Sequence, residues 1–110
     1  MQLTNSIATL LLVANVHAGC FSGGESWSSV DGARNAARTA CDNSLSGDYA
    51  GNTHRTYCVN GNGQKLEFTV HRTQDSSRNL PWSECYDGLQ KEITGCTNGG
   101  DTTYTNWRYM

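Results

Sequence analysis

Two segments of the chain place apolar or small residues three or four positions apart, which is the spacing of one helix face. The first predicts a helix from about Val30 to Asn43, and its stripe consists of Trp27, Val30, Ala33, Ala37, Ala40, Cys41 and Leu45. The second predicts a helix with Ser83 as N-cap and Gly95 just past its end, and its stripe consists of Trp82, Cys85, Leu89 and Ile93. We therefore expect Trp27 and Trp82 to lie in the core.

Between these helices, two segments have the composition and alternation of β-strands. Residues Thr53–Val59 are rich in β-branched and aromatic side chains. In Lys65–Arg72 every second residue is apolar, namely Leu66, Phe68 and Val70. The turn-forming segment Asn60–Gly63 joins the two, so the pattern predicts an antiparallel hairpin with one buried face.

The remaining segments predict a short strand at Asp48–Ala50, a polar loop at Thr73–Asn79 and a last strand within Thr102–Tyr109. The order is then helix, hairpin, helix, strand. The apolar stripes of the helices and the apolar face of the hairpin bury one another best when the helices pack on the sheet. The sequence predicts an α+β fold in which an antiparallel β-sheet packs with two α-helices as a small disulfide-stabilised α/β sandwich.

The first 18 residues have the pattern of a secretory signal peptide. A polar stretch, Met1–Ser6, precedes the apolar run Ile7–Ala14, and Val16–Ala18 offers small residues before a cut. The run is too short to span a bilayer, and no other apolar stretch approaches that length. We expect residues 1–18 to be removed and residues 19–110 to form a single secreted, extracellular domain.

Five cysteines follow the predicted cleavage site, which indicates a disulfide framework in an oxidising compartment. They are Cys20, Cys41, Cys58, Cys85 and Cys96. Only 36% of the whole chain is hydrophobic, so a domain of this size needs covalent support. Cys85 and Cys96 bracket the second helix and lie too far apart to bond to each other, but several other pairings remain open. Because five is odd, one thiol lacks a partner within the chain.

The charge pattern argues against several classes of function. Eight basic and ten acidic residues are scattered along the chain, without a basic patch that would bind nucleic acid or anionic lipid. His54 and His71 have no Cys or Asp at metal-ligand spacing. Glu84, Asp87 and Glu92 lie along one predicted helix, where a solvated face is expected rather than an acid–base pair. We expect no metal site, no cofactor and no catalytic residues.

Four motifs are distributed along residues 19–110. They are Gly19-Cys20-Phe21-Ser22-Gly23-Gly24-Glu25-Ser26-Trp27, Arg55-x-Tyr57-Cys58-Val59-Asn60, Glu84-Cys85-x3-Leu89-x2-Glu92-Ile93-x-Gly95-Cys96-x2-Gly99-Gly100 and Trp107-Arg108-Tyr109. Together they resemble a family of small secreted cysteine-rich fungal proteins whose characterised member is a glycan-binding, lectin-like protein with an α/β-sandwich fold. The cysteine layout is also similar to the fungal virally encoded killer-toxin fold, an antiparallel sheet with two helices. The resemblance implies a fungal origin and a glycan-binding protein without catalytic activity. The alternatives are a killer-toxin-like or effector-like protein that acts on foreign cells, and a structural cell-wall protein.

The killer-toxin layout implies the disulfides Cys20–Cys96 and Cys58–Cys85, with Cys41 unpaired in this sequence. In the family, the partner of that cysteine lies in a short continuation beyond the Trp-Arg-Tyr segment. The resemblance therefore leaves two interpretations, a missing C-terminal end after Met110 or a variant with a free Cys41. We expect the missing end, because an unpaired thiol is a liability in a secreted protein.

Aromatic residues in or near the predicted strands are candidate sugar contacts. Apolar C–H faces of sugars stack on aromatic rings, while their hydroxyls need amide or carboxylate partners. Tyr and Thr also fill strands by propensity alone, so composition by itself does not decide between the two explanations. With the family resemblance, we expect a carbohydrate partner that contacts Tyr57, Tyr104, Trp107 and Tyr109.

Overall fold

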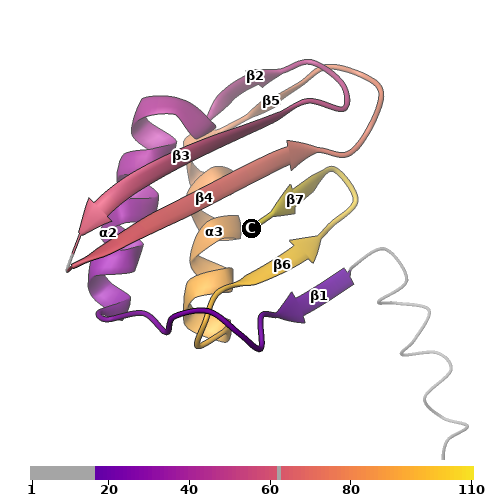
Figure 1. Ribbon diagram of the computed structural model, residues 1–110. Coiled ribbons are helices and arrows are strands. Elements are labelled where there is room, and N and C mark those ends of the chain that lie inside the picture. The colour runs from indigo at the N-terminus through magenta and orange to yellow at the C-terminus, as the bar shows by residue number, and fades with distance from the viewer. Residues whose placement is uncertain (1–16, 62) are drawn as a thin grey trace, which may run out of the picture.

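This computed structural model describes residues 17–61 and 63–110. These residues contain two α-helices and seven antiparallel strands (Figure 1). The predicted α+β class is confirmed. Most of the predicted signal peptide, residues 1–16, lies outside the described residues. Its last two residues, His17 and Ala18, begin the first strand.

Five strands form the main sheet and two form a small one. The main sheet has the order β1-β6-β7-β4-β3, and the small sheet pairs β2 with β5. The bounds are β1 His17–Cys20, β2 Gly47–Tyr49, β3 His54–Gly61, β4 Gln64–Arg72, β5 Arg78–Leu80, β6 Gly100–Thr103 and β7 Trp107–Tyr109. The predicted hairpin is present as β3 and β4, which pair from His54↔His71 to Gly61↔Gln64.

The sequence patterns missed three features of the sheets. The single last strand expected within Thr102–Tyr109 is instead a hairpin, because the chain turns between β6 and β7 and the Tyr104 amide donates to the Trp107 carbonyl (2.8 Å). The last two residues of the predicted polar loop belong to β5, whose partner β2 lies almost thirty residues away. Strand β1 pairs with β6, which sequence alternation could not indicate.

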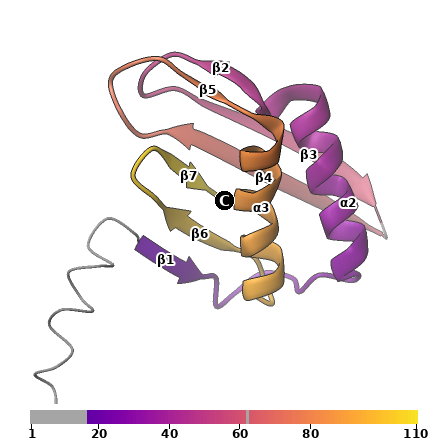
Figure 2. The ribbon, with the colours of Figure 1, turned by 180° about the vertical axis from the view of Figure 1, so that it is seen from behind.

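Both helices cover the same face of the main sheet (Figure 2). Helix α2, Val30–Ala40, continues into a π-helical turn, η1, Cys41–Leu45. Its N-cap is Ser29, whose hydroxyl accepts from the Gly32 amide (2.9 Å). Helix α3 spans Trp82–Gly95 and has Pro81 as N-cap, so the expected N-cap Ser83 lies inside the first turn.

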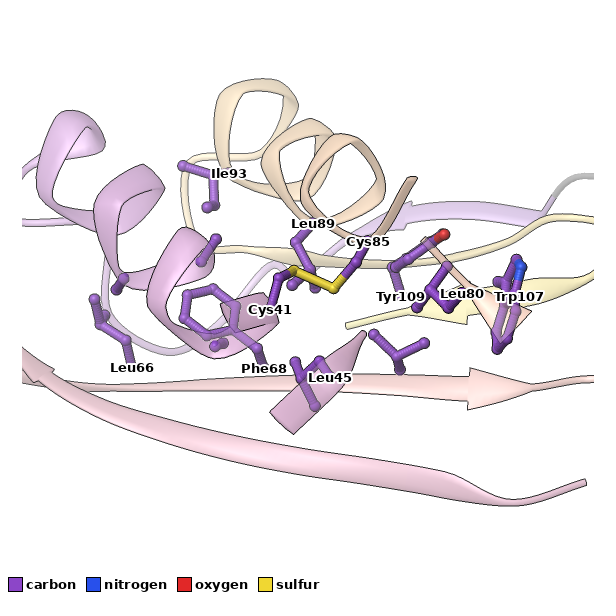
Figure 3. Packing of buried hydrophobic residues seen from close by; sticks show 14 of the residues in the cluster. Cys41, Leu45, Leu66, Phe68, Leu80, Cys85, Leu89, Ile93, Trp107 and Tyr109 are labelled. Carbon is purple, nitrogen blue, oxygen red and sulfur yellow. A yellow bond between two sulfur atoms is a disulfide. The ribbon is translucent and has the colours of Figure 1, made fainter. Parts of the chain in front are cut away.

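The core lies between this helical layer and the sheet (Figure 3). Leu66, Phe68 and Val70 are buried as their alternation predicts. Trp27 packs against the core and donates its indole N–H to the Cys96 carbonyl (2.9 Å). The expectation for Trp82 is wrong: its side chain is 39% exposed and stacks on Tyr86, one helical turn further on, with ring centroids 5.4 Å apart.

The disulfide pattern agrees with the killer-toxin layout at one bridge only. Cys20 is bonded to Cys96, but Cys85 is bonded to Cys41 rather than to Cys58. Cys41 and Cys85 are fully buried and face each other between the two helices (Figure 3). Cys58 is the free thiol and is exposed on the helix-free face of the sheet, opposite Glu67, so it cannot reach a cysteine beneath the sheet.

The expected Cys58–Cys85 bridge and the unpaired Cys41 are therefore both wrong. The cysteine without a disulfide partner is Cys58 instead.

Candidate functional site

An open pocket of about 270 Å³ lies between helix α3 and the turn that joins β6 to β7. We call it the hairpin pocket. Helix α3 contributes Glu84, Asp87, Gly88 and Lys91, and the turn and β7 contribute Tyr104, Thr105, Asn106, Trp107 and Tyr109. Three of the four aromatic residues predicted to contact sugar therefore meet in one pocket.

Tyr109 and Trp107 form the floor of the hairpin pocket. They are only 3% and 2% exposed. Tyr109 fits there because Gly88 has no side chain, since a Cβ at Gly88 would overlap the tyrosine ring. The Tyr109 hydroxyl donates to the Glu84 carbonyl (3.3 Å), and its ring lies 5.9 Å from that of Tyr104, edge to face. Burial in the first place, with the nearby Glu84 and Asp87 carboxylates, raises the pKa of Tyr109, so this phenol stays neutral.

The rim of the pocket carries the groups that a ligand would meet first. Tyr104 is half-buried, with the Lys91 ammonium 5.7 Å from the centre of its ring. Lys91 also forms an ion pair with Asp87 (3.0 Å) one helical turn away, and this interaction raises the pKa of the lysine. Glu84 on the same helix is exposed. The rim therefore carries an aromatic ring, two carboxylates that can accept hydrogen bonds and an ammonium group that can donate them.

The turn that carries Asn106 is held in place by a buried arginine. Arg72 donates to the carbonyl (3.2 Å) and to the side-chain oxygen (3.4 Å) of Asn106. Its other donors contact the Ser76 carbonyl and hydroxyl, each at 2.9 Å. The side-chain amide of Gln74 also donates to the Thr105 carbonyl (2.7 Å). With these bonds made in advance, the turn loses little freedom when a ligand binds.

Tyr57 lies apart from the hairpin pocket. It is half-buried on β3, packs against the core, and its hydroxyl accepts from the Asn43 amide (3.2 Å). The structure therefore separates Tyr57 from the other three predicted contacts.

The acidic residues of α3 do not share one environment. Glu84 and Asp87 are exposed, as expected of a solvated face, but the side chain of Glu92 is buried. Burial is the main cause that raises its pKa, and the charge of Asp101 adds to the effect while a hydrogen bond from Thr102 opposes it. Helical spacing could have shown this, because Glu92 follows the buried Leu89 by three positions.

The structure brings His54 and His71 together as register partners on β3 and β4, with ring centroids 5.9 Å apart. Within residues 17–61 and 63–110, no group of three or more His, Cys, Asp or Glu side chains is placed to hold a metal ion. Among the same residues no helix is long and apolar enough to cross a membrane.

Sequence reasoning named the aromatic side of the pocket but missed the helical side. The sequence could have shown that four residues share one face of α3, because they follow one another at spacings of three, one and three. These residues are Glu84, Asp87, Gly88 and Lys91. Nothing in the sequence indicated that this face would lie against β7. In comparisons with known proteins, no family model matches the chain and no curated protein matches it.

Proposed function

We propose that this protein is a secreted, non-catalytic glycan-binding protein that holds a sugar in the hairpin pocket. The observation that carries the proposal is the meeting of Tyr104, Trp107 and Tyr109 with Glu84, Asp87 and Asn106 in one open pocket. Sugars have both apolar faces and many hydroxyls, so this combination of rings, carboxylates and an amide is suited to them.

The exposures of the three aromatic residues assign them different roles. Tyr104 is only half-buried, and its ring would stack on the sugar. Trp107 and Tyr109 are too deeply buried to stack, so they would shape and close the floor. Sugar hydroxyls would donate to Glu84 and Asp87, accept from the Lys91 ammonium and exchange hydrogen bonds with the Asn106 side chain.

Secretion is part of the proposal and draws support from the cysteines. Two disulfides, Cys20–Cys96 and Cys41–Cys85, need an oxidising compartment to form and persist. The leader pattern in residues 1–18 and the resemblance to small secreted fungal proteins point the same way.

A glycan array probed with the purified, oxidised protein tests the proposal. We expect selective binding to a limited set of glycans. Tyr104→Ala should weaken binding at least about fivefold, because stacking on one ring contributes about 1 kcal/mol or more. Tyr57→Phe is the matched control and should bind like the parent protein, because Tyr57 lies outside the pocket.

Two results would contradict the proposal. One is the absence of binding to every glycan on the array by protein whose circular dichroism shows it folded. The other is binding that Tyr57→Phe abolishes and Tyr104→Ala leaves intact. Killing or necrosis caused by the protein on fungal or plant cells, without glycan binding, would favour a toxin or effector instead.

A further inference from the structure

A second open pocket, of about 280 Å³, lies next to the hairpin pocket along helix α3. We call it the disulfide pocket, because the bonded pair Cys20 and Cys96 lines it. Tyr104 and Lys91 line both pockets, so the two cavities adjoin at these side chains. We call the two pockets together the extended groove.

The extended groove is longer than a single sugar unit. Its helical side runs from Glu84 in the hairpin pocket to Gly95 in the disulfide pocket. At a rise of 1.5 Å per residue this is roughly 16 Å of helix, which exceeds the length of one pyranose ring. The opposite side runs from Thr102 on β6 to Trp107 on β7, two strands against which α3 packs (Figure 2). A groove of this length can hold linked sugar units in line.

Each half of the extended groove is lined by a residue with a buried polar atom that lacks a hydrogen-bond partner. In the hairpin pocket this atom is the indole Nε1 of Trp107, and Figure 3 shows it on the side of the ring that faces the helical layer. In the disulfide pocket it is Oε1 of Glu92. The two side chains are 2% and 5% exposed, and neither atom is satisfied by any other described residue. Because buried polar groups are normally hydrogen-bonded, a donor in one half and an acceptor in the other indicate a ligand that can both accept and donate.

The Glu92 carboxylate reaches the wall of the disulfide pocket. Its Oε1 atom lies beside the Gly19 carbonyl oxygen and the Cys96 sulfur, which belong to two other lining residues. These three atoms surround the position that a Cβ of Gly100 would occupy, at 2.7, 2.8 and 2.9 Å respectively. The side chain of Thr102, also in the lining, donates a hydrogen bond to the same carboxylate. This bond orients the carboxylate and leaves Oε1 to accept from a ligand.

We propose that the extended groove binds an oligosaccharide, with one sugar unit in the hairpin pocket and the next unit in the disulfide pocket. The inference rests on the proposed function and specifies its substrate class as glycans of two or more units. The linkage between the units passes over Tyr104 and Lys91, which the two pockets share. A hydroxyl of one unit donates to Glu92 Oε1, and an oxygen of the other accepts from Trp107 Nε1.

The probes are the mono-, di- and trisaccharides of glucose, galactose, mannose and their N-acetylamino forms, printed in each linkage on one array and titrated with the purified, oxidised protein. We expect the bound disaccharides to have at least tenfold higher affinity than the single sugars that compose them. The second unit adds a hydrogen bond to a carboxylate together with contacts in the disulfide pocket. In NMR spectra of the isotopically labelled protein, a bound disaccharide should shift amides in both pockets, namely those of Thr105 and Thr102.

Glu92→Gln separates the two halves of the extended groove. It should weaken disaccharide binding about fivefold, because a hydrogen bond to a carboxylate becomes a weaker bond to a neutral amide. Binding of the single sugars in the hairpin pocket should stay unchanged, since Glu92 does not line that pocket. Glu25→Gln is the matched control, because Glu25 is exposed and lies outside both pockets. This variant should bind every probe like the parent protein.

Three outcomes would overturn the inference. The first is a single sugar that binds as tightly as its di- and trisaccharides. The second is disaccharide binding that Glu92→Gln leaves unchanged. The third is the absence of binding to every di- and trisaccharide by folded protein. The first two results leave the proposed function intact, whereas silence on this array and on the broader glycan array would remove both.

Discussion

Glu92 is a buried ionisable residue whose charged form destabilises the folded protein. It lies among the buried side chains of α3, and burial raises the pKa of its carboxyl above the ordinary value of 4.5. The folded state thus binds the proton more tightly than the unfolded state does. The folded protein therefore loses stability as the pH rises from about 4.5 through the folded-state pKa.

Replacing Glu92 by glutamine removes this titration while nearly keeping the shape of the side chain. We expect Glu92→Gln to raise the free energy of unfolding at pH 7 by about 1 kcal/mol, the scale of one unsatisfied buried polar group. The difference should shrink toward zero near about pH 3, where the carboxyl is protonated in both states. Urea denaturation at both pH values measures it. Asp87→Asn, on the exposed face, should change stability by less than about 1 kcal/mol, and a Glu92→Gln protein that is less stable at pH 7 would contradict the argument.

At the scale of elements, the hairpin pocket exists because α3 and β7 approach closely at one point. Gly88 is that point, since the Tyr109 ring occupies the space of the missing side chain. A glycine inside a helix costs about 1 kcal/mol relative to alanine, and here the close packing of the tyrosine offsets that cost.

Gly88→Ala should therefore destabilise the protein, by about 1–3 kcal/mol, although alanine is the better helix former. The added methyl group forces Tyr109 out of the floor, so glycan binding should fall as well. Gly95→Ala is a matched control in the same helix, because nothing lies within 4 Å of its Cβ position. The control should leave thermal stability unchanged or slightly raised. Equal effects of the two substitutions would show that Tyr109 does not rest on Gly88.

Across the whole molecule, two disulfides of different accessibility join elements that are distant in sequence. The buried Cys41–Cys85 bridge joins the end of α2 to the first turn of α3. The Cys20–Cys96 bridge joins β1 to the residue that follows α3, and Cys20 is exposed. Removing a native disulfide from a domain of this size costs about 2–5 kcal/mol.

Limited reduction should open the two bridges in sequence. A thiol reagent needs access to sulfur, so we expect dithiothreitol to reduce Cys20–Cys96 before Cys41–Cys85. Alkylation followed by mass spectrometry of the digest identifies the order and the pairs. Cys58→Ser should leave both bridges intact and change stability by less than about 0.5 kcal/mol, because this exposed thiol is bonded to no other cysteine. A Cys58–Cys85 peptide in the unreduced digest would contradict the pairing.

Local patterns were sufficient for the elements whose neighbours in space are also neighbours in sequence. Alternation placed Leu66, Phe68 and Val70 in the core, and helical spacing placed Cys85, Leu89 and Ile93 there too. The same alternation in β3 could have placed Cys58 on the outer face, opposite to Tyr57 and Val59. The pairing taken from the family resemblance did not use that constraint.

By itself, the sequence determined the helices, the central hairpin and hence the α+β class, because hydrophobic periodicity is a local property of the chain. Only the tertiary structure decided which cysteines bond, that β1 and β6 pair, and that Tyr104, Trp107 and Tyr109 meet the charged face of α3 without Tyr57. These contacts join segments that are distant in sequence. They depend on how the layers pack together, and the periodicity within one segment carries no information about which other segment packs against it.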